Sequence, residues 1–276
     1  MRRAQALRPR WVGVWGGAVV GVWANWDRFE LRDEAGSVLL AWESTEDKAW
    51  VMRDFHLAGG RWLVVGVGTG IMSRGYRVYD REAGAWVVDA SIRSSDVGVV
   101  AVADDRPALL LGDGEEMVCH TVDGGGERWS ANVPDTFAAA FCPRSGRVVI
   151  AGTEVLVVLD GYGREQARAA WSGPEPSSLA WLGEARVLST AFGGGLRVLD
   201  AGTLETVATA RLDIREVRSV AVSPDGTRMA CMGNDGAAWI ADTDAMIWDH
   251  IPDVAAAAFV GERLVGLGSS GLRTLE

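Results

Sequence analysis

The chain has 276 residues, of which 48% are hydrophobic and 23% charged, a composition typical of folded globular proteins rather than disordered ones. Its net charge is −10 and its 27 basic residues are spread along the sequence, so we expect no nucleic-acid partner. No linker or change in composition divides residues 1–276, which predicts a single domain.

The chain begins with arginines and an apolar run that together imitate a secretion signal. The run, residues 11–24, is too short to span a membrane, and residues 19–33 match a pattern that recurs later in the chain. We therefore assign it to the folded domain and expect a cytoplasmic protein without a membrane partner. All but one of the basic residues are arginine, which favours a bacterial origin.

Six short apolar runs each end at an aspartate or shortly before one, and these aspartates recur at intervals of 37 to 47 residues. They are Asp33, Asp80, Asp123, Asp160, Asp200 and Asp242. A strand-and-turn unit with this period is typical of a propeller blade, which buries its sheet faces only between neighbouring blades.

Each unit divides into four strands, and the turn between the first two strands is rich in Gly, Pro and Asp. These turns fall at residues 16–17, 59–60, 104–107, 143–146, 183–184, 224–226 and 261–262. Seven turns of this kind predict an all-β, seven-bladed β-propeller of four-stranded antiparallel blades.

The last unit ends after its third strand, which would leave an unpaired sheet edge. The segment just before the first strand of the chain is placed to fill that edge. We expect the fourth strand of the last blade to come from Ala4, Gln5, Ala6, Leu7 and Arg8.

Two motifs resemble those of known propeller families. Ser-Pro-Asp-Gly at residues 223–226 with Asn-Asp-Gly at 234–236 resembles a WD-repeat blade, and Asp-Gly-Gly-Gly-Glu-Arg-Trp at 123–129 resembles the turn of quinoprotein-like propellers. The resemblance covers essentially the whole chain and implies the propeller architecture. The Gly-His dipeptide of WD repeats and the adjacent cysteines of quinoprotein dehydrogenases are absent, so we expect no quinone or other cofactor.

The residues that could carry chemistry have simpler structural interpretations. The recurring aspartates are expected to accept hydrogen bonds from the amides of their own turns. The Gly-x-Gly-x-x-Gly pattern at residues 266–271 is followed by a strand rather than by the helix that a dinucleotide site needs. His56, His120 and His250 lack the spacing of metal ligands, and the three cysteines lie in apolar runs. We therefore predict no catalytic residue, no metal site and no disulfide.

Thirteen tryptophans are expected mainly to pack between blades. Trp26 is the exception, since it falls in a loop between second and third strands. In a propeller these loops and the connections between blades emerge on one face, and loops on a rigid scaffold are common recognition sites. We expect a partner-binding face that contains Trp26, Asp27, Met72, Arg74, Asp213, Glu216, Asp249 and His250, the last in a polar loop between blades.

The leading interpretation is a non-catalytic protein–protein interaction module that serves as a scaffold subunit of a larger complex. One alternative is a propeller enzyme, a hydrolase or lyase, with its site in the central channel. Another is a lectin-like binder of small ligands, for which several blades should repeat the same aromatic and polar pair. The irregular loops favour one large, asymmetric partner.

Overall fold

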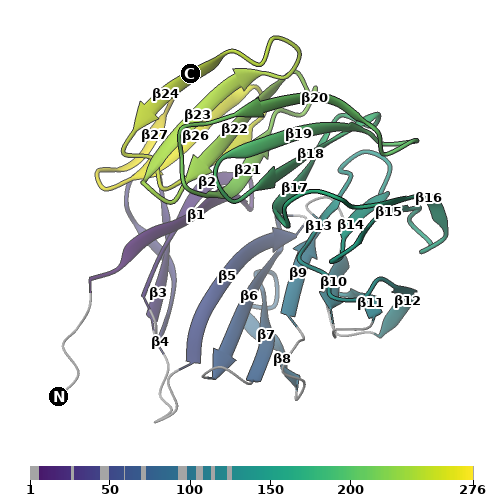
Figure 1. Ribbon diagram of the computed structural model, residues 1–276. Helices are drawn as coiled ribbons and strands as arrows, with labels where there is room; N and C mark the ends of the chain where they lie inside the picture. The colour runs from purple at the N-terminus through teal and green to yellow at the C-terminus, as the bar shows by residue number, and fades with distance from the viewer. Residues whose placement is uncertain are drawn as a thin grey trace.

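The computed structural model describes residues 6–25, 28–43, 50–58, 60–69, 73–92, 98–103, 108–112, 116–122 and 126–275. In these residues 27 strands form seven antiparallel sheets, and no helix occurs. The sheets stand around a central axis as the blades of a propeller, with the first strand of each sheet innermost (Figure 1). The predicted seven-bladed β-propeller is confirmed.

Within each blade the strands pair in the order of the sequence, from the axis to the rim. Blades one to three contain β1 (Arg8–Trp15), β2 (Ala18–Ala24), β3 (Arg28–Asp33), β4 (Val38–Glu43); β5 (Trp50–Ala58), β6 (Trp62–Thr69), β7 (Ser73–Asp80), β8 (Ala85–Ile92); and β9 (Gly98–Val102), β10 (Ala108–Gly112), β11 (Glu116–Thr121), β12 (Glu127–Asn132). Blades four and five contain β13 (Ala138–Phe141), β14 (Val148–Ala151), β15 (Val155–Leu159), β16 (Glu165–Ala170); and β17 (Pro176–Leu182), β18 (Arg186–Ala191), β19 (Gly195–Asp200), β20 (Thr206–Arg211). Blades six and seven contain β21 (Val217–Val222), β22 (Arg228–Gly233), β23 (Ala237–Asp242), β24 (Trp248–Pro252); and β25 (Ala256–Val260), β26 (Arg263–Gly268), β27 (Gly271–Thr274).

Blade seven is a three-stranded sheet in the described part of the chain. Of the expected closing strand, Ala4 and Gln5 lie outside the described residues, and Ala6 and Leu7 have no strand structure. Arg8, which we expected in the same strand, instead begins β1 and pairs with Ala24 in blade one. The contact between blades seven and one is made by apolar side chains of the two sheets, including Val12 and Leu267.

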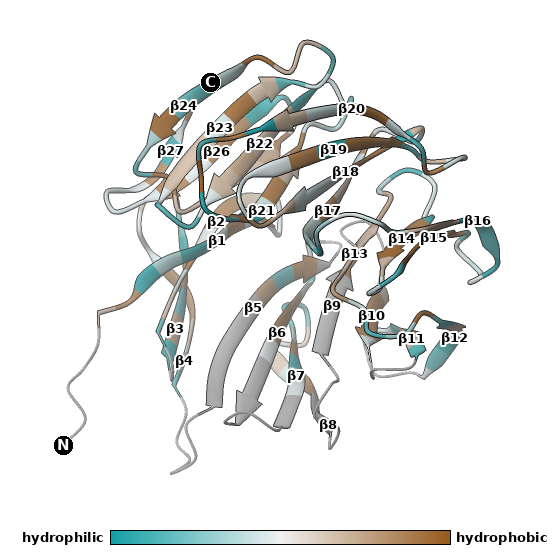
Figure 2. Ribbon diagram, viewed as in Figure 1, coloured by the Kyte–Doolittle hydropathy of each residue, from teal (hydrophilic) through white to brown (hydrophobic). Residues whose placement is uncertain are grey.

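The second strand of each blade is mostly apolar because neighbouring sheets cover both faces of the blade. In β14, Val148 and Ile150 pack toward blade three, whereas Val149 and Ala151 pack toward blade five. This alternation is the two-residue period of a strand. The outermost strands β4, β12, β16 and β20 alternate between exposed and half-buried positions, and β12 and β16 carry the more hydrophilic residues (Figure 2).

Each of the seven boundaries between neighbouring blades contains its own hydrophobic cluster. Eleven of the thirteen tryptophans belong to these clusters or pack against them, as predicted; Trp26 and the side chain of Trp50 are outside the described residues. Trp181, for example, is buried between blades four and five and donates a hydrogen bond from Nε1 to Ala140 O at 2.9 Å. The indole thus fills the core without leaving its N–H unpaired.

The recurring aspartates stabilise the turns between third and fourth strands, as expected from the sequence. The side chain of each accepts hydrogen bonds from amides of its own turn, as in the bonds from Gly202 N and Thr203 N to Asp200 Oδ1 at 2.9 and 2.8 Å. Such bonds form at Asp33, Asp80, Asp160, Asp200 and Asp242. Asp123 lies outside the described residues.

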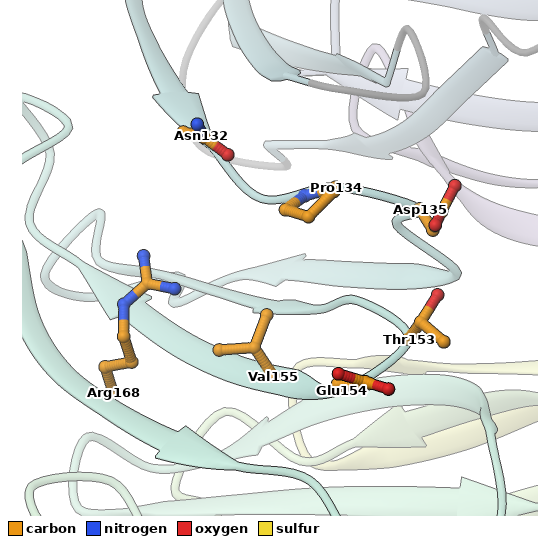
Figure 3. Close-up of a pocket in the computed structure, with 7 residues that line it drawn as sticks. All are labelled: Asn132, Pro134, Asp135, Thr153, Glu154, Val155 and Arg168. Atoms are coloured by element: carbon orange, nitrogen blue, oxygen red, sulfur yellow. The ribbon is translucent and has the colours of Figure 1, made fainter.

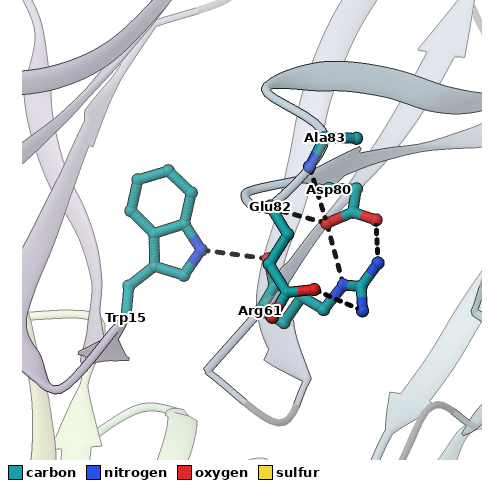
Figure 4. Close-up of polar contacts among 5 residues, drawn as sticks. All are labelled: Trp15, Arg61, Asp80, Glu82 and Ala83. Carbon is teal, nitrogen blue, oxygen red and sulfur yellow. Dashed lines mark hydrogen bonds and ion pairs between the residues drawn. The ribbon is translucent and has the colours of Figure 1, made fainter.

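One of these turns also joins blades one and two (Figure 4). Asp80 receives two hydrogen bonds from Arg61, at 2.9 and 2.5 Å, and Trp15 of blade one donates to Arg61 O at 3.3 Å. The bonds from Arg61, followed by those from the amides of Glu82 and Ala83, lower the pKa of Asp80 from 3.8 to about 2. The charged carboxylate is therefore favoured in the folded state.

We predict that Leu188→Ala will lower the free energy of unfolding by about 2–5 kcal/mol, because it opens a cavity between blades five and six. Leu188 is fully buried in that cluster. The matched control is Val207→Ala in the same blade, where the side chain is 57% exposed. Urea denaturation measures both changes, and a similar loss for the two variants would contradict the packing described here.

We predict that Asp80→Asn will lower the melting temperature at pH 7 and make the loss of stability in acid shallower. Because folding lowers the pKa of Asp80, its charged form stabilises the protein above about pH 4, and this contribution is lost as the pH falls toward 2. Thermal melts between pH 7 and pH 2 measure the effect. Asp213→Asn, at an exposed carboxylate that makes no hydrogen bond or ion pair with the described residues, should leave the curve unchanged.

Candidate functional site

The loops between second and third strands and the connections between blades lie on one face of the propeller, which we call the connector face. This arrangement follows from the strand order, since every strand is antiparallel to its neighbour and successive turns alternate between the two faces. The opposite face, which we call the turn face, carries the aspartate turns and the tight turns between first and second strands.

The structure assigns the eight predicted site residues to different environments. Trp26, Asp27 and Met72 lie outside the described residues, and Arg74 is in β7, where only its backbone is described. Asp213 is exposed and Glu216 half-buried, and both lie in the connection between β20 and β21 on the connector face.

Asp249 and His250 are not in a loop between blades, as we expected, but in β24, the outermost strand of blade six. His250 pairs with Trp239 of β23, and their ring centroids are 4.7 Å apart. An outermost strand is in contact with solvent along one edge and therefore carries polar residues, which made this segment resemble a loop. Both side chains are exposed at the rim of blade six.

Two exposed phenylalanines on the connector face were not among the predicted site residues. Phe192, in the loop between β18 and β19, is 61% exposed, and Phe137, immediately before β13, is 42% exposed. In sequence, each continues or adjoins an apolar strand and therefore looks like part of the core. The three glycines that follow Phe192 are the one sequence signal that its strand has already ended.

The loop that carries Phe192 is held against the connection between blades five and six. Gly193 N donates to Arg215 O at 2.7 Å, and Leu212 N donates to Gly194 O at 2.9 Å. Gly194 has a φ of +74°, and a Cβ at this position would lie 2.2 Å from Leu212 O. The fold therefore requires glycine here, and the two bonds place Phe192 beside the segment that contains Asp213 and Glu216.

An aspartate holds the corresponding loop of blade seven. Asp253, in the connection between blades six and seven, accepts hydrogen bonds from Ser269 N at 3.0 Å and from Ser269 Oγ at 2.9 Å. These bonds lower the pKa of Asp253. The turn at Ser269 is the segment that fits the dinucleotide pattern, and it joins β26 to β27, so the expectation of a strand-to-strand turn is confirmed.

A shallow, open pocket of about 750 Å³ lies on the connector face between blades three and four (Figure 3). Asn132 and Arg168 lie toward one end, and Asp135, Thr153 and Glu154 toward the other. Pro134 and Val155 are its apolar lining residues, and Arg168 is paired with Glu165 at 2.8 Å. The pocket is open and has a mixed polar and apolar lining, whereas small-molecule sites are usually enclosed and mostly apolar.

Among the described residues, no group of three or more His, Cys, Asp or Glu side chains is arranged to hold a metal ion. Cys119, Cys142 and Cys231 are buried thiols that form no disulfide, and burial raises the pKa of the Cys231 thiol to about 12. The described part of the chain also contains no helix long and apolar enough to cross a membrane.

No protein-family model and no curated protein sequence matches the chain. Among solved structures, one chain in the crystal structure of the mitotic checkpoint complex is similar over 96% of this chain and 88% of its own length, with a TM-score of 0.74 and 16% sequence identity. Raptor from Chaetomium thermophilum is similar over 98% of this chain and 28% of its own length, with a TM-score of 0.71 and 11% identity. Both similarities are to propellers of the WD-repeat type, and at these identities they show the fold alone.

We predict that Gly194→Ala will destabilise the protein more than Gly193→Ala. Both glycines have a positive φ, which costs an alanine about 1–2 kcal/mol, but a Cβ on Gly193 would meet open space. The Cβ of Gly194→Ala would in addition contact Leu212 O. Urea unfolding separates the two costs, and equal destabilisation would show that the loop is not held as described.

Proposed function

We propose that the protein is a non-catalytic scaffold that binds a partner protein through its connector face. The observation that carries this proposal is Phe192, a large apolar side chain that is 61% exposed on a loop held by backbone hydrogen bonds. An aromatic ring on a loop held in place leaves apolar surface exposed to water. A partner that covers the ring gains the free energy of removing that surface from water, and it need not order the loop.

The surroundings of Phe192 have the composition of a protein-binding surface. Phe137 exposes a second aromatic side chain on the neighbouring blade, and charged residues, including Asp213 and Arg215, lie in the adjoining connection. Aromatic and arginine side chains supply most of the binding energy in many interfaces, while charged residues at the edge determine specificity and orientation.

The fold also supports this role. Seven blades packed face to face provide a rigid base on which irregular loops are displayed, and the loops of this chain differ from blade to blade. Such asymmetry suits one large partner better than a set of equivalent small-ligand sites. One structure similar in fold belongs, by its title, to a multiprotein complex, which agrees with a subunit role.

We predict that Phe192→Ala will weaken partner binding at least about tenfold, since aromatic residues that dominate interfaces contribute about 2 kcal/mol or more. Tagged wild-type and variant chains are used to capture proteins from a lysate of the source organism, and the dissociation constant is then measured with the purified partner. Because Phe192 is exposed, the melting temperature should stay unchanged.

The matched control is Tyr162→Ala, which removes an aromatic ring that is 78% exposed in the turn between β15 and β16 on the turn face. This variant should capture the partner as the wild type does. Equal capture by all three chains would place the binding surface elsewhere. A tightly bound metabolite or metal ion in the purified protein, in place of a protein partner, would overturn the scaffold proposal.

A further inference from the structure

The innermost strands carry β-bulges at corresponding positions near the connector face. In β1 the pairing shifts between Pro9 and Trp11, and in β21 it shifts between Val217 and Ser219. The inner strands of blades two, three and five shift in the same way. A bulge leaves one residue out of the ladder and redirects its side chain, and bulges are frequent next to functional sites.

The residues left out of the ladder in blades one and six are both arginines, Arg10 and Arg218. Each is exposed. Blade seven separates these two blades. Its inner strand β25 begins with three alanines, at residues 256–258, and their short side chains leave room for the longer arginine side chains on either side. Arg8, two residues before the first bulge, is also exposed on β1.

Arg10 lies close enough to Arg218 and to Arg8 for each of these charges to act on it. Partial burial, followed by the positive charges of Arg218 and Arg8, lowers the pKa of Arg10. None of the three makes an ion pair or side-chain hydrogen bond with the described residues. Within the described residues, the cluster is therefore positive charge without an acidic partner, in a protein whose net charge is −10.

Acidic residues lie on the blade-five and blade-six side of this basic cluster, in the connections on the connector face. Glu216 precedes Arg218 by two residues, Asp213 lies in the same connection, and Glu175 precedes the inner strand of blade five. These acidic residues would repel a long polyanion. A peptide with a central anionic group would instead match the arginine cluster, and basic residues on either side of that group would match the acidic residues. Arginine suits this cluster because its planar fork donates two parallel hydrogen bonds to a carboxylate.

We propose that Arg10 and Arg218, with Arg8, form an anion-binding site at the connector-face end of the central channel, and that the site receives glutamate or aspartate carboxylates of a partner's mixed-charge peptide segment. This inference rests on the proposed scaffold function and specifies the chemistry of the segment that the connector face binds. It identifies a contact at the axis that is separate from the apolar contact at Phe192.

The test uses two labelled peptides of equal composition and the intact protein. The first peptide has two adjacent glutamates flanked by lysines, and the second has two adjacent lysines flanked by glutamates. We expect the wild type to bind the first peptide in a salt-sensitive manner and the second at least tenfold more weakly. The double variant Arg10→Gln with Arg218→Gln should bind the first peptide at least about tenfold more weakly, since it loses the charge-assisted hydrogen bonds of both guanidinium groups. Fluorescence anisotropy measures all of these affinities.

The matched control is Arg263→Gln, which removes the same charge from an exposed arginine at the turn-face end of β26. Its affinity for the first peptide should stay within about twofold of the wild-type value, and thermal melting checks that every variant folds. Absence of binding by the wild type, equal binding of both peptides, or an equal loss with Arg263→Gln would overturn the inference. If the wild type binds neither peptide while Phe192→Ala still weakens partner capture, the results support the scaffold proposal and contradict the anion site.

Discussion

The structure depends on the packing of apolar side chains between neighbouring blades. A single four-stranded sheet of this chain has two apolar faces and cannot cover either by itself, so each blade is stable only between two others. Seven hydrophobic clusters, one at each boundary, meet this requirement around the whole ring. Blade seven joins the ring through the same kind of contact, in which Val265 and Leu267 pack with Val12 and Val19 of blade one.

Because the packing between blades stabilises the fold, the connector face can carry residues that are not needed for folding. The stabilising contacts lie in the strands and in the aspartate turns, so the loops on the connector face can hold residues that do not contribute to the core. Phe192 is a loop residue of this kind, and the bulges in β1 and β21 likewise leave Arg10 and Arg218 outside the strand ladders. Phe192 exposes apolar surface, and the arginines concentrate positive charge. Both features carry a free-energy cost in the unbound protein, which binding of a partner would relieve.

The repeat could be predicted from the sequence because short, local motifs mark each unit. The interval between turn aspartates and the seven glycine- or proline-containing hairpin turns predicted the blade number, and the aspartates act in their turns as expected. The outermost strand of blade six was misassigned, since the polar residues of an edge strand, such as Asp249, have the composition of a loop. The position of Arg8 was also wrong, because β1 extends back through Pro9 and pairs Arg8 with Ala24 of β2.

The sequence predicted the candidate site less well than it predicted the fold. The predicted connector face is present, with Asp213 and Glu216 on it, but Phe192 looked like a core residue and was not predicted. Exposure of an apolar residue depends on whether another blade covers it, which is a property of the assembled ring. Backbone hydrogen bonds to a distant connection, absent from any local pattern, hold the Phe192 loop in its position.

The sequence by itself therefore determined the number of blades, the turns and the alternation of apolar residues, because each arises from residues within about one strand of one another. Only the tertiary structure decided which side chains stay uncovered and which distant residues come near one another. Arg10 and Arg218 lie 208 positions apart in the sequence, and they come close enough to interact electrostatically because the ring places blade one beside blade seven, which adjoins blade six.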